Sequence, residues 1–298
     1  MAKTIKDFIK EPGLLFVSLG HRGWWHWMDD ETYLKIAFRS KMGKKLRLNP
    51  PVTFSEKLQW LKLHDRKPEY SHMVDKAEAK KYVAERIGEE YIIPTLGVWD
   101  RVEDIDFTVL PDQFVLKATH DSGGLVICKD KSKLDVEAAK EKLKKSLAKS
   151  FYWGQREWPY KAVRPRIIAE KYIEDANGEL NDYKFFCFGG KAKFFKIDFD
   201  RHIEHHANYY DCDGNLLPFG EVAYMPIPER KLDMPRHLKL MIELAEKLSA
   251  GMKFLRVDFY EVNGQVLFGE LTFYPISGFG KYTDEAWDEK LGDMVDIS

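Results

Sequence analysis

The chain has 298 residues, enough for two or three coupled subdomains around a shared core. Its 47 basic and 48 acidic side chains nearly cancel, which argues against the basic field of a nucleic-acid coat, so we expect no nucleic-acid partner. The three cysteines (Cys128, Cys187 and Cys212) form no CxxC pair, which argues against a disulfide framework or zinc ribbon and favours a reducing, cytoplasmic location.

The first ninety residues favour helices. The apolar run Gly13–Gly20 is too short to span a bilayer, so we expect no transmembrane segment. Thr53 and Glu56 have the spacing of a capping box, in which each side chain satisfies a free backbone N–H group near the other. Asp75, with Glu78 three residues later, predicts the start of a second helix.

From residue 114 the apolar pattern changes to that of strands. Phe114–Ala118 and Leu125–Cys128 are predicted strands joined by a loop that contains two glycines. Val136–Leu147 has helical spacing, and Arg166–Ile173 is another predicted strand.

The last third of the chain is rich in predicted strands. They form two hairpins separated by a predicted helix: Tyr183–Phe188 with Lys193–Phe199, the helix Leu238–Leu248, and Leu255–Val262 with Gln265–Leu271. Asn263 and Gly264 connect the second hairpin, and this dipeptide fits a type I′ turn.

The second hairpin carries the most informative charged residues. Arg256 and Asp258 are two residues apart on one strand, so their side chains project from the same face. Counting outward from the turn places Asp258 close to Gly269 and Glu270. Two carboxylates without a histidine make a hard oxygen site that suits Mg²⁺. The alternative is a solvated pair of strand charges, one of them neutralised by Arg256.

Lys117 ends a predicted strand just before the loop of Ser122, Gly123 and Gly124. Such an arrangement can place an ammonium group on a phosphate while the backbone N–H groups of the loop hold neighbouring oxygens. The alternative is an ordinary solvent-facing lysine.

The order of these parts is more specific than any one of them. The segments FVLKATHDSGG, RIIAEKYIED and FLRVDFYEVNGQVLFGELTFYPISG resemble the ATP-grasp superfamily over roughly Asp75 to Gly280. They look most like its TupA-like branch, which is associated with teichuronopeptide and other surface-polysaccharide synthesis. The resemblance implies an α+β ATP-grasp fold in which two α+β subdomains clamp ATP between antiparallel sheets. We expect a helical N-terminal region at 1–90, a central lid subdomain at 91–173, and a C-terminal subdomain with the Mg²⁺ site at 174–298.

The resemblance also implies roles for individual residues. Lys76 and Lys117 match the lysines that hold the ATP phosphates, and Ser122, Gly123 and Gly124 match the loop that closes over those phosphates. Glu170, with the backbone of Lys171 and Ile173, matches the residues that contact adenine. Asp182 matches the carboxylate that holds the ribose. Asp258 and Glu270 match the Mg²⁺ ligands, and Arg256 matches the cation that steadies an acyl phosphate. Thr272 stands where many ATP-grasp enzymes have asparagine, so it is either a metal ligand or a group behind the ligands.

The implied activity is an ADP-forming ligase that uses ATP and Mg²⁺ to join a carboxylate to an amine. The branch suggests a small-molecule or polysaccharide substrate, with an amino acid attached to a uronic acid, and peripheral association with envelope-synthesis machinery. Arg201 and Asp200 are candidates for the acceptor side. His202, His205 and His206 fit no common zinc spacing and are expected to be polar residues at a strand end.

Two other functions remain open from the sequence. A sugar or polysaccharide kinase could use the same ATP site, with Asp198 or Asp200 as the base for a hydroxyl group. A glycosyltransferase-associated nucleotide-binding protein is the weaker alternative, because the Asp211-Cys212-Asp213 pattern beside Gly214 is typical of a turn.

Overall fold

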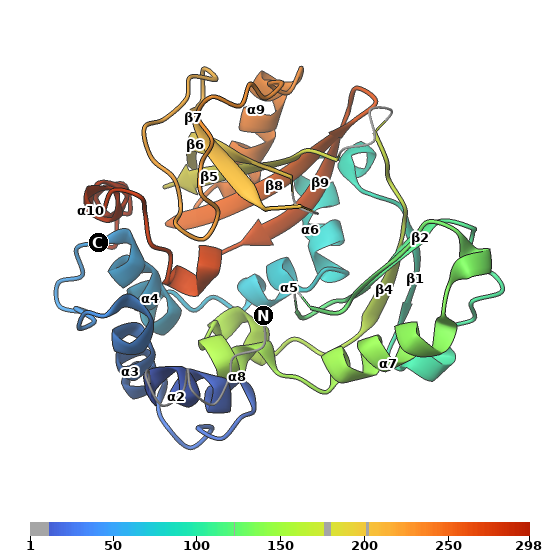
Figure 1. Cartoon of the computed structure of the whole chain (residues 1–298), viewed down its shortest axis with the longest axis horizontal. Helices are drawn as coiled ribbons and strands as arrows, with labels where there is room; N and C mark the ends of the chain where they lie inside the picture. Colours follow the sequence, from blue (N-terminus) through green and yellow to red (C-terminus); the bar gives the residue numbers. More distant parts are fainter. Residues whose placement is uncertain (1–11, 122, 176–179, 201–202) are drawn as a thin grey trace.

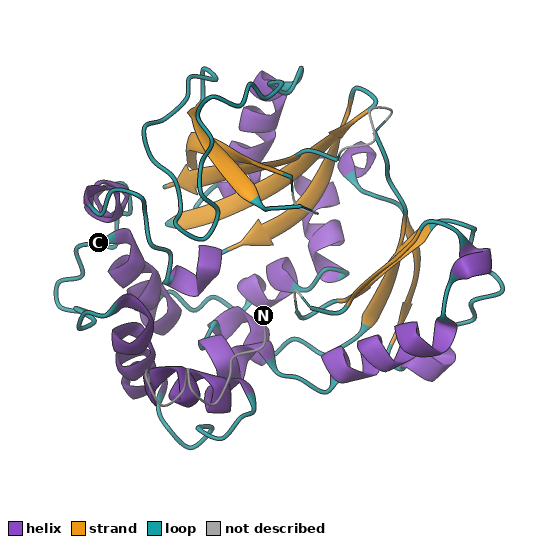
Figure 2. Ribbon diagram, viewed as in Figure 1, coloured by secondary structure: helices purple, strands orange, loops and turns teal. Residues whose placement is uncertain are grey.

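The computed structural model describes residues 12–121, 123–175, 180–200 and 203–298 (Figure 1). Two antiparallel sheets and the helices around them make up the molecule (Figure 2), which confirms the predicted α+β class. None of the helices in the described part of the chain is long and apolar enough to cross a membrane.

In the described part of the chain, five helices precede the first strand: α2 (Pro12–His21), α3 (Asp30–Met42), α4 (Phe54–His64), α5 (Glu69–Val74) and α6 (Glu78–Ile87). The capping box before α4 is confirmed, because Thr53 accepts from the Glu56 amide and Glu56 accepts from the Thr53 amide at 3.1 Å. The helix predicted to start at Asp75 starts at Glu78 instead, and Asp75 Oδ1 accepts from the amides of Ala77 at 2.8 Å and Glu78 at 3.3 Å just before it.

The first sheet has four strands in the order β1-β4-β2-β3: β1 (Thr95–Trp99), β2 (Phe114–Ala118), β3 (Leu125–Cys128) and β4 (Ile167–Lys171). The predicted bounds of β2 and β3 are confirmed. α7 (Val136–Leu147) packs Ala139 and Leu143 against Phe114 and Leu116 of β2. The short helix α8 (Phe151–Gln155) follows α7 in the chain.

The second sheet has five strands in the order β7-β6-β5-β8-β9: β5 (Asp182–Phe188), β6 (Lys191–Phe199), β7 (His206–Asp211), β8 (Phe254–Val262) and β9 (Gln265–Thr272). α9 (Leu238–Ser249) covers one face of this sheet (Figure 1), and α10 (Ala286–Asp293) lies against α4. Short 3₁₀ turns complete the chain: η1 (Glu89–Tyr91), η2 (Val102–Asp104), η3 (Lys131–Lys133), η4 (Trp158–Lys161) and η5 (Pro275–Gly278).

The hydrophobic cores follow the two sheets. Helices α4 to α6 share one core with the five-stranded sheet, in which Phe54 and Leu58 belong to the same cluster as Phe186 and Phe254. The four-stranded sheet has a separate core. The predicted subdomain boundaries after residues 90 and 173 stay predictions.

One face of the five-stranded sheet changes from aromatic to charged along its strands. Alternation places Asp182, Lys184, Phe186 and Phe188 of β5 on this face. The ladder pairs Lys184 with Lys196 of β6 and with Asp258 of β8, and it pairs Asp258 with Glu270 of β9. A row of charged side chains therefore crosses four adjacent strands, and this row forms one wall of the candidate site.

Candidate active site

A cavity of about 290 Å³ is lined by residues of both sheets and of α6. Its charged lining residues are Lys76, Lys80, Lys117, Asp121 and Glu170 on one side, and Asp182, Lys184, Asp258 and Glu270 on the other. Lys117 and Asp258, which are 141 positions apart in the sequence, therefore face the same space.

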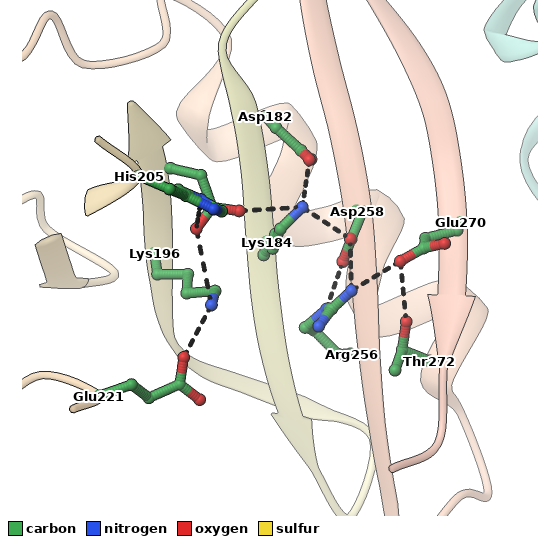
Figure 3. Close-up of polar contacts among 10 residues, drawn as sticks. Asp182, Lys184, Lys196, His205, Glu221, Arg256, Asp258, Glu270 and Thr272 are labelled. Atoms are coloured by element: carbon green, nitrogen blue, oxygen red, sulfur yellow. Dashed lines mark hydrogen bonds and ion pairs between the residues drawn. The ribbon is translucent and has the colours of Figure 1, made fainter. Parts of the chain in front are cut away.

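The acidic wall is organised by Arg256 (Figure 3). Its Nε donates to Asp258 Oδ1, and its Nη2 donates to Asp258 Oδ2 and to Glu270 Oε1, each at 2.7 Å. Asp258 is 1% exposed, whereas 46% of the Glu270 side chain is accessible from the cavity. Arg256 thus holds the two carboxylates together while one of them stays open to a ligand.

A β-bulge sets this arrangement. Phe259 pairs with Phe268, but Asp258 pairs with Glu270, so Gly269 is the extra residue in β9. A Cβ atom on Gly269 would lie 3.1 Å from the Asp258 carbonyl oxygen, closer than ordinary packing allows. The bulge therefore keeps Glu270 on the same face as Asp258.

Lys184 is a central residue that our sequence analysis missed. Its Nζ lies 3.1 Å from Asp258 Oδ2 and 3.3 Å from Asp198 Oδ2, and it also contacts Asp182 (Figure 3). Burial by itself would lower the pKa of Lys184, but Asp182 and Asp258 outweigh it and raise that pKa. A signal for Lys184 was present in the sequence. Asp182 and Lys184 stand among the aromatic residues of one strand, and so many aromatic residues indicate a buried strand, in which charged side chains need partners.

Glu270 is kept ionised by the same network. Burial would raise the pKa of Glu270, but Arg256, Lys76 and Lys184 lower it below its ordinary value. Burial likewise opposes the charge of Arg256, whose pKa is nevertheless raised by Asp258 and Glu270. Both groups are therefore charged at neutral pH.

The acidic wall has the chemistry of a Mg²⁺ site. Its charged groups are Asp182, Asp198, Glu221, Asp258 and Glu270 against Lys184, Lys196 and Arg256, so carboxylates are in excess. In the described residues no three His, Cys, Asp or Glu side chains form a closed metal site. Mg²⁺ takes one or two carboxylates and completes its shell with water and phosphate oxygens. Asp258 and Glu270 are the residues that would hold it.

Thr272 lies beside this pair. Its Oγ1 donates to Glu270 Oε1 at 3.2 Å, and it is not among the residues that line the cavity. We therefore propose that Thr272 orients Glu270 from behind, as outer groups commonly do for metal ligands.

The opposite wall is basic. Lys117 Nζ and Lys80 Nζ each lie 2.5 Å from an oxygen of Glu170, which is 5% exposed. Lys76 Nζ donates to the backbone carbonyl of Asp121 at 2.7 Å, and no carboxylate of the described residues lies within ion-pair distance of it. Burial lowers the pKa of Lys76, and Glu270 works against that effect. An added anion at Lys76 would therefore displace no carboxylate of the described residues.

Lys80 was also missed by our sequence analysis. It lies four residues after Lys76, and this spacing places two side chains on one side of a helix, so the pattern was available. Burial lowers the pKa of Lys80, against the opposing effect of Glu170.

Of the three residues predicted to contact adenine, Glu170 lines the cavity, whereas Lys171 and Ile173 do not. Glu170 is bound between two lysines. The amide of Lys171 donates to the Pro94 carbonyl at 2.9 Å, so this amide is not available to a ligand. Ile173 packs beside Ile93 and does not line the cavity. Their contacts with adenine, and that of Asp182 with ribose, stay predictions.

The glycine loop is organised by Asp121. Its Oδ1 accepts from the amides of Gly123 and Gly124 at 3.0 Å each. Burial would raise the pKa of Asp121, but bonds from Ser146 and these amides lower it. A Cβ atom on Gly124 would lie 2.7 Å from Ala118 Cβ, so glycine is needed there. Ser122 lies outside the described residues.

The two residues predicted to bind the acceptor are Arg201 and Asp200. Arg201 lies outside the described residues. Asp200 adopts a positive φ of 53°, and its Oδ1 lies 3.9 Å from Arg230 Nη2. It is not among the residues that line the cavity, so its acceptor role stays a prediction.

The turn that follows β9 is held by a buried lysine of α4. Ile276 and Ser277 have positive φ values of 47° and 53°, which side chains other than glycine rarely adopt. Lys62 Nζ donates to the Ser277 carbonyl at 2.8 Å and to its hydroxyl at 2.9 Å. The N-terminal helices therefore fix the backbone that leaves the acidic wall.

Several solved structures are similar to the chain. No curated protein sequence matches the chain. Similar solved structures include D-alanine–D-alanine ligase from Bacillus anthracis complexed with ATP (17% identity, TM-score 0.39, covering 68% of this chain and 54% of that one). Another is a biotin carboxylase complex from Campylobacter jejuni (14% identity, TM-score 0.46, covering 81% of this chain and 52% of that one). A third is N5-carboxyaminoimidazole synthetase from Staphylococcus aureus (14% identity, TM-score 0.39, covering 68% of this chain and 45% of that one).

The chain thus spans about half the length of these structures. The family model for TupA-like ATP-grasp proteins matches residues 56–296, which is most of the chain and includes both walls of the cavity. The chain belongs to the TupA-like ATP-grasp family.

Proposed function

We propose that the chain is an ADP-forming carboxylate–amine ligase that uses ATP and Mg²⁺. We further propose that it attaches an amino acid to a uronic acid of a surface polysaccharide or its precursor, in the cytoplasm and close to the envelope-synthesis machinery. ATP-grasp enzymes are ATP-dependent ligases that work with Mg²⁺. The observation that carries the proposal is the meeting of Lys76 and Lys117 with Asp258 and Glu270 around one cavity.

The two walls of the cavity would have different roles in phosphoryl transfer. Lys76 and Lys117 would bind phosphate oxygens on the basic wall, and Asp258 and Glu270 would hold the metal on the acidic wall. Bound Mg²⁺ would supply neutralisation of charge on the transferred phosphoryl group. Phosphoryl transfer depends on such positioning and charge stabilisation more than on covalent chemistry by the protein.

Arg256 would stabilise the activated carboxylate. Its Nη2 binds Glu270 and Asp258, so its positive charge lies beside the two carboxylates that would hold the metal. The glycine loop, braced by Asp121, would cover this region and exclude water, which protects an acyl phosphate from hydrolysis.

The experiment is a screen for phosphate release. Uronic acids such as D-glucuronate and D-galacturonate are combined with single amino acids and Mg-ATP. A ligase releases ADP and phosphate only when carboxylate and amine are both present. A Glu270→Gln variant controls for contaminating ATPase, and a wild-type protein that releases no phosphate with any pair would contradict the proposed substrates.

A kinase would give a different product from the same cavity. Transfer to a hydroxyl group leaves phosphate on the sugar and needs no amine. Mass spectrometry of the sugar product therefore separates the two activities.

A further inference from the structure

A second hollow, of about 590 Å³, lies on the helical part of the molecule. It is formed by the segment between α2 and α3, the first turn of α3, the end of α4, and α8 with the turn η4. It shares no lining residue with the ATP cavity. Sites for small molecules commonly have volumes of about 300–1,000 Å³, so the hollow is large enough to hold a ligand.

Trp27 gives this hollow an open aromatic ring. Trp27 is 70% exposed, which is unusual for so large an apolar side chain. Its ring meets that of Trp25 edge to face, with the ring centroids 6.3 Å apart. Trp25 is itself anchored, because its Nε1 donates to the Phe16 carbonyl at 2.9 Å and its ring stacks on Phe16. An exposed ring that an ordered neighbour supports is typical of a contact surface.

Trp153 of α8 is the second tryptophan that lines the hollow, and Arg156 orders it. Arg156 is fully buried, and its Cζ lies 4.7 Å from the centre of the Trp153 ring. Its Nη2 donates to the Trp25 carbonyl at 2.6 Å, so the same guanidinium group also holds the segment that carries Trp27. The His26 ring meets Trp153 edge on, with the centroids 6.1 Å apart. The aromatic lining is therefore formed before a ligand arrives.

The three carboxylates among the described lining residues are engaged by other groups. Asp29 caps α3 through a hydrogen bond of 2.9 Å from a backbone amide. Asp30 Oδ2 accepts from Arg66 Nη2 at 2.7 Å, and Glu31 Oε1 lies 2.5 Å from Lys35 Nζ. Two of the three charges are thus neutralised within the protein, which lowers the repulsion of an incoming anion.

Lys161 of η4 contributes a positive charge to the hollow. In the described part of the chain no carboxylate lies within ion-pair distance of its Nζ, which is 5.2 Å from the centre of the Tyr152 ring. His64 packs on Trp60 with the ring centroids 4.6 Å apart and makes no hydrogen bond with a described residue. An ammonium group beside open aromatic rings suits a ligand that has both a carboxylate and an apolar face.

The turn η4 also separates this hollow from the ATP cavity. Tyr160 lines the ATP cavity, and the next residue, Lys161, lines the hollow. Consecutive Cα atoms lie about 3.8 Å apart, so the two spaces are neighbours. On this side of the molecule α8 contacts α2 and η4, and η4 contacts α5 (Figure 1). A chain-like ligand in the hollow would therefore lie beside the space where ATP is expected.

We propose that this hollow binds a chain of uronic-acid units, with the face of one pyranose ring on Trp27 and a carboxylate at Lys161. The face of an aromatic ring carries partial negative charge, which attracts the C–H groups on the face of a pyranose. The charge of Lys161 distinguishes a uronate from a neutral sugar. The inference rests on the proposed function, because it gives the polymeric substrate of that ligase a binding site of its own.

A lipid bilayer is the other class of partner that exposed tryptophans suit. Contact with a bilayer requires apolar side chains that protrude from the protein into the interface. Trp27 instead lines a hollow, together with carboxylates, Arg66 and Lys161. These surroundings favour the sugar chain.

The test is the binding of oligogalacturonate to the full chain without nucleotide, measured by isothermal titration calorimetry. Trp27→Ala should raise the dissociation constant about tenfold, the effect of losing one stacked ring. Trp24→Ala is the matched control and should bind as wild type does, because Trp24 is 61% exposed in the same segment but does not line the hollow. Both rings are mostly exposed, so neither variant should change the melting temperature. Wild-type protein that binds no oligogalacturonate would overturn the proposal, as would equal affinities for Trp27→Ala and wild type.

A second comparison tests the charge of the ligand. Lys161→Gln should weaken the binding of oligogalacturonate by about threefold to fivefold at low ionic strength, the effect of an exposed ion pair. Maltooligosaccharide, which has no carboxylates, should bind wild type more weakly than oligogalacturonate does. Equal affinities for the two sugars would refute the assignment to a uronic acid.

The results also separate this site from the ligase activity. Binding of oligogalacturonate without phosphate release in the screen would refute the proposed function and leave the sugar site in place. Phosphate release with oligogalacturonate at the same KM in Trp27→Ala and in wild type would overturn the sugar site alone. Vesicles of phosphatidylglycerol test the membrane: vesicle binding that both tryptophan variants lose, with no binding of sugar, would assign the segment to a bilayer and overturn the proposal.

Discussion

Asp258 lies directly opposite Glu270 in the β8–β9 ladder, and one nitrogen of Arg256 donates to both carboxylates. The pair combines a buried member with an accessible one, and the bulge at Gly269 keeps the two on one face. A site of this kind holds its charges in place before a ligand arrives, which reduces the reorganisation that phosphoryl transfer would otherwise require.

The first prediction concerns Glu270. Glu270→Gln should lower ATP-dependent product formation by about 100-fold or more, because an amide is a poorer Mg²⁺ ligand and leaves Arg256 without one carboxylate partner. The measurement is initial rate against Mg²⁺ concentration. Glu261→Gln, on the neighbouring strand β8 and bound to His237, should keep normal rates. Full activity in Glu270→Gln would refute the metal assignment.

The second prediction concerns Lys76. Mg-ATP should raise the melting temperature of the wild-type protein, because a ligand that binds only the folded chain stabilises it. Lys76→Met should remove most of this shift, since no carboxylate among the described residues neutralises that ammonium group in place of phosphate. Lys144→Met is the control: Lys144 pairs with Glu103 on the exposed surface and should leave the shift intact. A normal shift in Lys76→Met would count against its phosphate role.

The third prediction concerns Lys184. Lys184→Met leaves Asp182, Asp198 and Asp258 without their common cation, and breaking a buried charge group costs about 3–5 kcal/mol. Urea unfolding at pH 7 should show this loss. Lys191→Met, whose partner Glu246 lies on the surface, should change the free energy of unfolding by less than about 0.5 kcal/mol. Similar stabilities for the two variants would contradict the central place of Lys184.

The fourth prediction is a pH dependence that arises from Glu170. Burial would raise the pKa of Glu170, but Lys117 and Lys80 lower it below its ordinary value. Between the lowered pKa and the ordinary one the unfolded chain binds a proton that the folded chain does not, so stability rises with pH. The contribution is complete above about pH 4.5, the ordinary value for glutamate, and is lost as the pH falls through the folded pKa.

Glu170→Gln should remove that dependence. At pH 7 it should also cost about 1.5–3 kcal/mol, the usual worth of hydrogen bonds to charged groups. The measurement is urea unfolding without nucleotide between pH 3 and pH 7. The difference between wild type and variant should shrink toward low pH, and a constant difference would contradict the assignment.

Local pattern was sufficient for the secondary elements that carry the site. The bounds of β2 and β3 and the capping box before α4 follow from alternation and side-chain spacing, which act over a few residues. The resemblance to TupA-like ATP-grasp proteins is also a property of the sequence, because it depends on the order of short motifs, and the family match confirms it.

Tertiary structure decided which charges meet. The sequence allowed Asp258 to face either Gly269 or Glu270, and the bulge selected the carboxylate. Lys184 meets its carboxylate partners only when β5 lies between β6 and β8, because strand pairing joins residues that no local spacing relates. Spacing along a chain determines the face on which a side chain lies, but partners across a sheet are chosen by long-range packing, and the chemistry of this cavity depends on those partners.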